Sequence, residues 1–543
     1  MKEANKRRIT FLPLVLALFL VGGMLLGNML SRLSRDDRFQ VYPKNSKISN
    51  VIDYISAEYV DSVNTPSLVD KTIPEILKQL DPHSVYIPAV DLQEYNEPLE
   101  GNFSGIGVQF NLQEDTVAIV NTIQNGPSEK AGILAGDRIV RVNDSLIAGV
   151  KMHSDDIVKM LKGKKGTQVD VSIARRGVDD LIDFTITRDN IPLYSVDVHY
   201  MITDEIGYIK ISNFSRTTYR EFKDAVEALN GQGLTKLILD LRSNGGGYLD
   251  AATQITDEFL EKGKLIVYTE GRAQPRRDAY ATENGDLIDK EIVILIDEFT
   301  ASASEILAGA IQDNDRGLIV GRRSFGKGLV QEQTTFSDGS ALRLTIARYY
   351  TPTGRCIQRP YDNGTEEYYY ELQSRFLRGE FVEQDSIRFT DSLKYTTPGG
   401  RIVYGGGGIM PDVFVPYDTT LLTEYYTKVR NRGLIYRYAF KFTDAHRNEL
   451  QEFVSHTAIS EYLDQQKLLQ QFVEFAEDQG IKRSLEDIII SERLIITQLK
   501  AYIARNIIDN PGFYPIIQEI DPTLQKGIEV LADFPSVSTD GNL

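Results

Sequence analysis

Two continuous apolar runs constrain the fold of this chain more than any other feature. Residues 234–241 read LTKLILDL, and residues 292–297 read IVILID. Runs of this kind are typical of strands that are buried on both faces of a parallel sheet. The first run breaks into three glycines, and the second passes through a turn of small residues into a helical pattern. With a further strand at Gly317–Gly321 and a hairpin over Thr334–Tyr350, the alternation indicates an α/β domain.

The rest of the 543-residue chain divides by pattern into parts around this domain. We expect an α/β and α+β multidomain protein whose boundaries are marked by glycine, proline and charge clusters. The expected parts are a basic flank (1–8), an apolar membrane segment (9–30), a linker (31–46), a helical segment (47–102), a β-rich unit (103–189), the α/β core (190–415) and a helical C-terminal extension (416–543).

The N-terminus predicts a membrane anchor. Lys2–Arg8 is basic, and Ile9–Leu30 carries no charge. About 20 apolar residues span the hydrocarbon core of a bilayer as a helix. The run lacks the small-residue cleavage site of a signal peptide, so we expect it to stay attached. The basic flank would remain in the cytoplasm, and in a bacterium with two membranes the rest of the chain would lie on the periplasmic side of the inner membrane.

Composition excludes several classes of function. The net charge of -17 opposes nucleic-acid binding, which depends on Lys and Arg contacts to phosphates. A single cysteine, Cys356, excludes an intrachain disulfide and a Cys-rich zinc site, and we expect it to be an ordinary half-buried residue. His83, in the loop DPHS, has no second ligand at metal-binding spacing, so we expect an ordinary loop residue. We expect no metal and no cofactor.

The segment VGRRSFGKGLVQ (320–331) holds Gly321, Gly326 and Lys327 at the GxxxxGK spacing of a phosphate-binding loop. Such a loop needs a helix after it and a Ser or Thr directly after the lysine, to reach magnesium. Here Gly328 takes that position, and a β-rich stretch follows. A nucleotide hydrolase is therefore the weaker interpretation of this segment.

Lys327 fits the role of a general base better, because its sequence neighbours are apolar. Burial disfavours the charged ammonium, lowers the pKa and makes the lysine able to accept a proton. TASASE (300–305), where a buried strand turns into a helix, offers a nucleophile beside helix N–H groups that stabilise an oxyanion. A Ser–Lys pair is a known variant of the Ser–His–Asp triad. The residues alone leave Ser302 and Ser304 open as the nucleophile.

The β-rich unit contains GIGV (105–108) and then GPSEKAGILAGDRIVRVND (126–144). Pro127 fits the first turn of a short helix and Gly132 fits its C-terminal stop. Together these strings resemble a PDZ domain of the kind attached to bacterial proteases. The resemblance implies that a peptide adds as a strand to the sheet edge. It also implies that the peptide's C-terminal carboxylate binds to backbone N–H groups of Gly105, Ile106, Gly107 and Val108.

The longer string TASASEILAGAIQDNDRGLIVGRRSFGKGLVQ (300–331) resembles the core of the carboxyl-terminal processing proteases, a Ser–Lys family with a PDZ domain. The order of parts agrees from Ile48 to Val413. The resemblance implies a core related to the crotonase and Clp protease fold, with the PDZ domain inserted. It implies Ser302 as the nucleophile, Lys327 as the base and Gln331 as the residue that orients the lysine; a spacing of four along a strand would put the last two on one face.

The same resemblance implies a serine endopeptidase that cleaves proteins near their C-terminus through an acyl-enzyme. Backbone N–H groups of Ala303 and of Gly246, in the glycine-rich turn, would form the oxyanion hole. The expected partners are protein tails and, through the N-terminal helix, a membrane. The alternative is a catalytically inactive PDZ scaffold or adaptor. The sequence leaves open whether the C-terminal helices form a homo-oligomer, cover the active site or bind a regulatory adaptor.

Overall fold

The computed structural model describes residues 47–113, 115–283, 285–387 and 391–533. The chain divides into two units, Met1–Glu75 and Ile76–Leu543. The predicted membrane segment, residues 9–30, lies outside the described residues. In the described ranges, no helix is both long enough and apolar enough to cross a bilayer.

The predicted helical segment at the start of the described chain contains helices α2 (Lys47–Glu58) and α3 (Thr65–Leu77). They are followed in the second unit by strand β1 (Val85–Ile87) and helix α4 (Leu92–Glu100). Helix α4 ends at Gly101, whose left-handed backbone (φ 73°) suits glycine.

A six-stranded sheet forms the centre of the α/β core, in the order β10-β11-β12-β15-β16-β21. Strand β10 is antiparallel to β11, and the other neighbours are parallel. The two apolar runs of the sequence are β12 and β15, and almost every residue in them is buried, as predicted. The strands are β10 (Val196–Met201), β11 (Ile206–Ile211), β12 (Lys236–Asp240), β15 (Glu291–Ile296), β16 (Leu318–Gly321) and β21 (Val413–Phe414).

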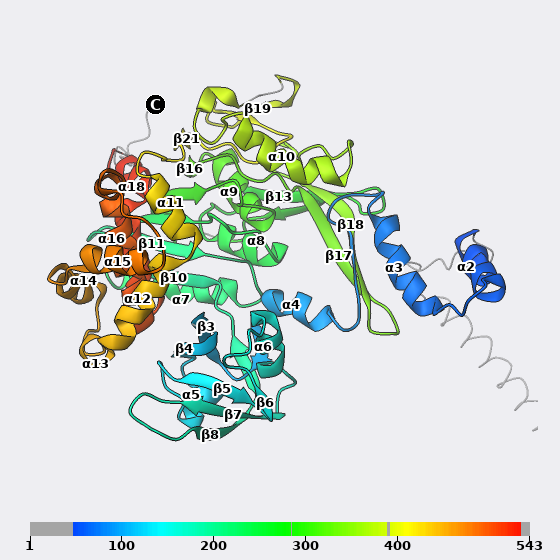
Figure 1. The fold of residues 1–543 in the computed structure, drawn as a ribbon. Coiled ribbons are helices and arrows are strands. Elements are labelled where there is room, and N and C mark those ends of the chain that lie inside the picture. Colours follow the sequence, from blue (N-terminus) through cyan, green and yellow to red (C-terminus); the bar gives the residue numbers. More distant parts are fainter. Residues whose placement is uncertain (1–46, 114, 284, 388–390, 534–543) are drawn as a thin grey trace, which may run out of the picture. The chain divides into compact units, whose positions relative to one another are not determined.

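Helices cover both faces of this sheet (Figure 1). On one face α7 (Thr218–Asn230), α8 (Leu249–Asp257) and α9 (Ala303–Asp313) bury their apolar residues against it. The other face is covered by α18 (Pro522–Asp533), which packs on β12, β15 and β16. Part of the predicted C-terminal extension is thus a layer of the core.

A second sheet lies beside the core, in the order β1-β18-β13-β14, with β17 also paired to β18. The predicted hairpin is the antiparallel pair β17 and β18, which turns at Asp338–Gly339. The further strands of this sheet and a small separate pair, β19-β20, are β13 (Leu265–Glu270), β14 (Arg277–Tyr280), β17 (Leu329–Thr335), β18 (Ala341–Tyr350), β19 (Lys394–Thr396) and β20 (Ile402–Tyr404).

The unit predicted over 103–189 contains a sheet in the order β3-β4-β5-β7-β8, with β6 paired to β5, and a separate pair β2-β9. Its short helix begins at Pro127 and stops at Gly132 (φ 95°), as the sequence predicts. Its elements are β2 (Asn102–Gly105), β3 (Val108–Gln113), β4 (Thr116–Thr122), α5 (Pro127–Ala131), β5 (Arg138–Val142), β6 (Ser145–Leu146), α6 (Ser154–Leu161), β7 (Gln168–Ala174), β8 (Ile182–Thr187) and β9 (Asp189–Pro192).

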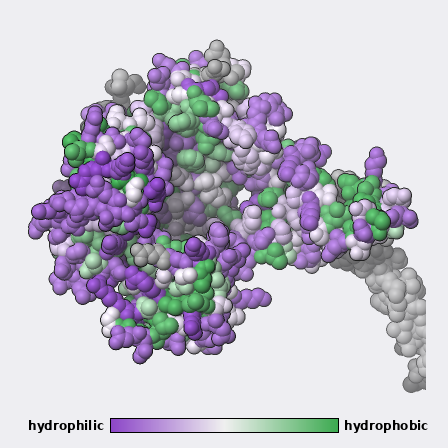
Figure 2. Space-filling model, in the orientation of Figure 1, coloured by the Kyte–Doolittle hydropathy of each residue, from purple (hydrophilic) through white to green (hydrophobic). Residues whose placement is uncertain are grey.

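The C-terminal region is helical and has a core of its own. Figure 2 shows that much of its visible surface is hydrophilic. Phe440 of α12 packs on Val120 of β4, and Arg138 donates to Asp444 over 2.9 Å, so this region contacts the 103–189 unit. The remaining helices are α10 (Thr365–Leu377), α11 (Glu424–Asn431), α12 (Leu434–Ala445), α13 (Arg447–Leu450), α14 (His456–Asp464), α15 (Leu468–Asp478), α16 (Leu485–Ile508) and α17 (Asn510–Ile517), with 3₁₀ turns η1 (Gln384–Ser386), η2 (Asp391–Leu393) and η3 (Gln518–Ile520).

Candidate active site

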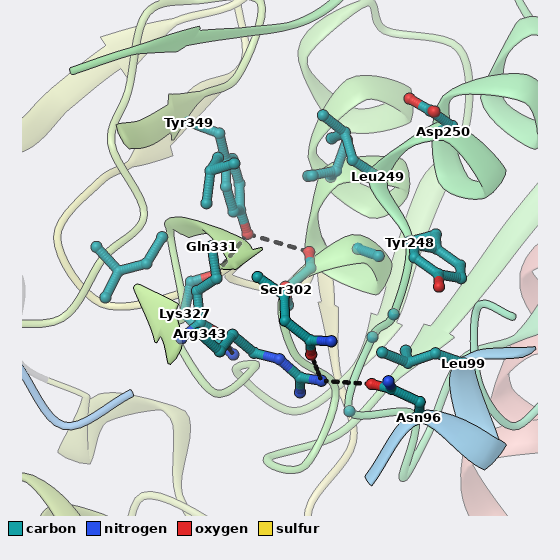
Figure 3. A pocket seen from close by; sticks show the side chains of 18 of the residues that line it. Asn96, Leu99, Tyr248, Leu249, Asp250, Ser302, Lys327, Gln331, Arg343 and Tyr349 are labelled. Carbon is teal, nitrogen blue, oxygen red and sulfur yellow. Dashed lines mark hydrogen bonds between the residues drawn. The ribbon is translucent and has the colours of Figure 1, made fainter. Parts of the chain in front are cut away.

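Three turns meet at the carboxyl ends of the neighbouring strands β12, β15 and β16, the edge at which open α/β sheets place their sites. Main-chain bonds join the turns: Ala301 N–H donates to Asn244 O, and Phe325 N–H donates to Thr300 O, each over 2.9 Å. Together they border a cavity of about 620 Å³ (Figure 3). The cavity is lined by Gly246, Ser302, Ala303, Lys327 and Gln331, so the structure brings every predicted residue of the catalytic core together.

The two candidate serines have different environments in the structure. Ser302 sits at the N-terminus of α9 with φ 57°, a strained conformation for a residue other than glycine, and faces the cavity. Ser304 is fully buried, and its hydroxyl donates to Asn244 O over 3.1 Å. Ser302 therefore fits the nucleophile, as the resemblance implies.

Lys327 is deeply placed, and its ammonium Nζ donates to Gln331 Oε1 over 3.1 Å. Burial lowers the pKa of Lys327, and the nearby positive charge of Arg343 lowers it further. Lys327 and Gln331 do not lie together on one strand, contrary to the expectation from their spacing. Lys327 lies before β17, which begins at Leu329, and the ladder has a bulge between Val330 and Gln331. The contact therefore forms across a turn and a bulge, and it does not follow from strand alternation.

His83 lies in a loop, as expected, but that loop belongs to the site. Gln331 Nε2 donates to His83 O over 2.5 Å, which fixes the amide oxygen toward Lys327. Asp81 shapes the loop by accepting hydrogen bonds from the N–H groups of His83 and Ser84, both over 2.8 Å. The His83 ring contacts Tyr368 OH at 2.8 Å, and burial lowers its pKa to about 4, so the ring is neutral at physiological pH.

Glu305 connects the segments that carry Ser302 and Lys327, a role that was not predicted from the sequence. Its buried carboxylate accepts N–H bonds from Ser302 (2.8 Å), Gly326 (2.7 Å) and Lys327 (2.9 Å), and a hydroxyl bond from Ser324 (2.5 Å). Burial raises the pKa of Glu305 to about 7, against the opposing effect of these four donors. The sequence does contain a pattern that indicates a main-chain contact of Glu305, because Ser302 and Glu305 have the S-x-x-E spacing of a capping box.

Tyr349 makes a second connection, which no sequence motif indicates. Its hydroxyl lies 2.7 Å from Lys327 O and 3.1 Å from Ser302 O, and its ring is buried (Figure 3). The main chains of the Ser302 and Lys327 segments are thus held both through their N–H groups by Glu305 and through their carbonyls by Tyr349.

The two predicted oxyanion donors differ. Ala303 begins α9, where the helix dipole and free N–H groups favour an anion. Gly246 (φ 101°) must be glycine, because a Cβ there would lie 2.8 Å from Ser302 Cβ. Its N–H, however, already donates to Asn244 Oδ1 over 2.9 Å, so it could serve as a donor only if that bond breaks. The role of Asn244 was not predicted.

The phosphate-loop interpretation disagrees with the local structure. Lys327 leads into strand β17, whereas a phosphate loop needs a helix there. Gly321 (φ 129°) ends strand β16, where a Cβ would lie 2.1 Å from Ile296 O, so close strand packing explains this glycine.

A separate small groove of about 140 Å³ contains all four predicted carboxylate-binding residues, Gly105, Ile106, Gly107 and Val108. Its other wall includes Val158 and Leu161 of α6, and Figure 2 shows hydrophobic residues gathered there. Strand β3 beside it is an edge strand of its sheet, so its backbone is available for strand addition.

Comparison with known families gives three matches. The model of peptidase family S41 matches residues 205–366, and the PDZ domain model matches residues 104–186. A family of unknown function matches residues 425–509, within the C-terminal helices.

Several similar proteins are named as carboxy-terminal processing proteases. A carboxy-terminal-processing protease of Bartonella bacilliformis is 35% identical over 350 residues, which cover 63% of this chain and 80% of the relative. The carboxy-terminal processing protease CtpA of Bacillus subtilis is 33% identical over 345 residues, which cover 63% of this chain and 72% of the relative. A solved structure, a photosystem II D1 C-terminal processing protease, aligns with 25% identity and a TM-score of 0.36, covering 68% of this chain and 92% of that one.

Proposed function

Because this chain belongs to the carboxy-terminal processing protease family, in which it is a serine-type peptidase acting on protein tails, we propose that Ser302 is its nucleophile and Lys327 its general base. The observation that carries the proposal is the part-buried ammonium of Lys327, held by Gln331 at the cavity that Ser302 also lines. Burial favours neutral lysine, which is the form that accepts a proton.

The reaction follows from these positions. Neutral Lys327 takes the proton of the Ser302 hydroxyl as the oxygen attacks the scissile carbonyl. The oxyanion is stabilised by the N–H of Ala303 and a second N–H of the glycine-rich turn, Gly246 or a neighbour. The Lys327 ammonium returns its proton to the leaving amine, and an acyl-enzyme remains. Lys327 then deprotonates the water that hydrolyses the ester.

The groove beside β3 supports capture of the substrate's tail. We propose that the tail adds as a strand to β3 and that its carboxylate binds to the loop from Gly105 to Val108. We further propose, from the resemblance of residues 300–331, that the core is related to the crotonase and Clp protease fold. The charge-free run 9–30 supports an inner-membrane anchor with the peptidase on the periplasmic side, which fractionation of cells that express the full chain tests.

Proteolysis of an unstructured protein with a free C-terminus tests the catalytic assignment. The full chain is compared with Ser302→Ala, Lys327→Ala and Ser304→Ala. We expect the first two variants to be folded and inactive, because each lacks a reacting group. Ser304→Ala should remain active and lose about 1 kcal/mol of stability, since only one buried hydrogen bond is removed.

Activity that survives in Ser302→Ala would overturn the assignment of the nucleophile. If the wild type binds tail peptides but cleaves no protein, the chain acts as the alternative, a PDZ scaffold. Loss of activity in Ser304→Ala at a wild-type melting temperature, with activity retained in Ser302→Ala, would assign the nucleophile to Ser304.

A further inference from the structure

Arg343 is a cation in the active-site cavity that the proposed reaction does not use. It lies on β18 and lines the cavity with its side chain half-buried. Its guanidinium Nη2 donates to Gln333 Oε1 over 2.9 Å and to Asn96 Oδ1 over 3.4 Å (Figure 3). Both acceptors are neutral amides, and within the described part of the chain the guanidinium makes no ion pair.

Other arginines of the same core are placed differently. Arg355 pairs with Asp313 (2.7 Å), Arg323 with Glu380 (2.6 Å) and Arg242 with Asp240 (2.6 Å). A charge removed from water is unfavourable unless an opposite charge compensates it. Burial lowers the pKa of Arg343, but an arginine stays protonated in a protein. Its charge is thus left uncompensated and borders the cavity.

The other charges of the cavity do not neutralise it. Glu100, on the wall formed by α4, is engaged by Arg216 through two bonds of 2.9 and 2.8 Å. Asp250 lies on the far side of the cavity from Arg343 (Figure 3). Lys327, on the near side, is cationic or neutral. The part of the cavity between Arg343 and Ser302 is therefore positive or neutral.

We propose that Arg343 forms a subsite for a carboxylate of the substrate, close to the bond that is cleaved. This inference rests on the proposed peptidase function and adds a substrate class to it. A guanidinium binds a carboxylate through two parallel N–H bonds, which neutral amides cannot match in strength. Gln333 and Asn96 hold the guanidinium by one nitrogen and orient it. The carboxylate has two sources: a Glu or Asp side chain beside the scissile bond, or the terminus of a short leaving tail.

Four quenched fluorescent peptides of one sequence distinguish these sources. They carry Glu or Gln beside the cleaved bond, and a free or an amidated C-terminus. The full-length wild type, Arg343→Gln and Arg343→Lys are compared, each at a pH above the rise of its own activity profile. Arg348→Gln is the matched control, since Arg348 is exposed on the same strand and does not line the cavity.

We expect the wild type and Arg348→Gln to cleave one carboxylate form with a kcat/KM about tenfold or more above that of its amide counterpart. Arg343→Gln should lose that preference, and Arg343→Lys should retain part of it. If the preference for the free terminus persists in Arg343→Gln, it comes from the groove that contains Gly105 to Val108, the PDZ groove. Arg343 then does not bind the carboxylate of a leaving tail.

Equal cleavage of all four peptides by the wild type would refute the subsite while leaving the peptidase function intact. A Glu preference that is unchanged in Arg343→Gln would refute it as well. Absence of any cleavage that Ser302→Ala abolishes would instead remove the proposed function, and the subsite with it. If the Arg343 variants do not fold, the wild-type preference for Glu over Gln beside the cleaved bond decides the matter, because the PDZ groove accounts only for a preference for the free terminus.

Discussion

At the scale of single residues, the active site depends on groups that hold the main chain as much as on the groups that react. Glu305 and Tyr349 fix the N–H and carbonyl groups of the Ser302 and Lys327 segments. The family resemblance of residues 300–331 implied Ser302, Lys327 and Gln331, because each stands in a dense motif, whereas the residues alone left Ser302 and Ser304 open. Tyr349 could not be predicted, since its partners come from segments that only the folded sheets bring together.

The pH dependence of activity should report Lys327. The base is active when neutral, so kcat/KM rises with pH through the pKa of Lys327, which burial and Arg343 hold below the ordinary value of about 10.4. Arg343→Gln removes a positive neighbour, which makes the ammonium easier to form and raises that pKa. The rise should therefore move to higher pH in the variant. Profiles that coincide would show that the two charges do not interact.

Glu305 should couple stability to pH. Its pKa is raised to about 7 in the folded chain, from an ordinary value near 4.3. Between these values the folded chain keeps a proton that the unfolded chain has released, so the free energy of unfolding falls as the pH rises from about 4 to about 7. In Glu305→Gln, this pH-dependent part of the free energy of unfolding should be absent. The variant should also lose activity more than tenfold, because an amide cannot accept all four hydrogen bonds.

Denaturant unfolding across this pH range provides the measurement for Glu305. Glu227→Gln, at an exposed position of α7, is the matched control and should keep the wild-type change of the free energy of unfolding with pH. If the free energy of unfolding of Glu305→Gln changes with pH as it does in the wild type, the pH dependence does not come from Glu305.

At the scale of elements, strand ends explain why residues far apart in sequence meet. The parallel strands β12, β15 and β16 are neighbours, so the turns after them lie along one edge. Apolar runs and glycines predicted these strands well, because burial on both faces leaves a strong pattern. The bulge in β17 and the packing of α18 on the sheet were not predicted, since both depend on contacts between distant segments.

Gly527 of α18 should be sensitive to larger side chains. A Cβ at this position would lie 3.1 Å from Leu295 Cδ2 on β15, so the helix approaches the sheet closely. Gly527→Val should lower the free energy of unfolding by about 1–3 kcal/mol through overpacking, as urea unfolding would measure. Glu529→Ala, at an exposed site of the same helix, should change it by less than about 0.5 kcal/mol. A wild-type midpoint for Gly527→Val would show that α18 does not press on the sheet.

At the scale of the whole molecule, the PDZ unit is joined to the C-terminal helices as well as to the core. Phe440 is buried against Val120 and Ala118 of β4, while the ion pair between Arg138 and Asp444 is partly exposed. We expect these two contacts to contribute unequally to the free energy of unfolding, since apolar burial contributes more than an exposed ion pair.

Phe440→Ala should therefore increase amide hydrogen exchange in β4 and α12 and cost about 3 kcal/mol, whereas Asp444→Ala should cost at most about 1 kcal/mol. Amide exchange in α9 should stay at the wild-type rate in both variants, because that helix is buried in the separate hydrophobic core against the six-stranded sheet. Equal effects of the two substitutions would mean that charge, and not packing, holds the PDZ unit in place.

The position of α18 has a consequence for the time at which the peptidase becomes active during its own synthesis. The sheet that carries Ser302 keeps one apolar face open until Pro522–Asp533 has left the ribosome. At about 5–20 residues per second, the roughly 200 residues between Lys327 and Asp533 take on the order of ten seconds or longer to translate. A nascent chain thus contains Ser302 and Lys327 well before Pro522–Asp533 can cover the sheet beneath them, so we expect peptidase activity to begin only after α18 has been synthesised.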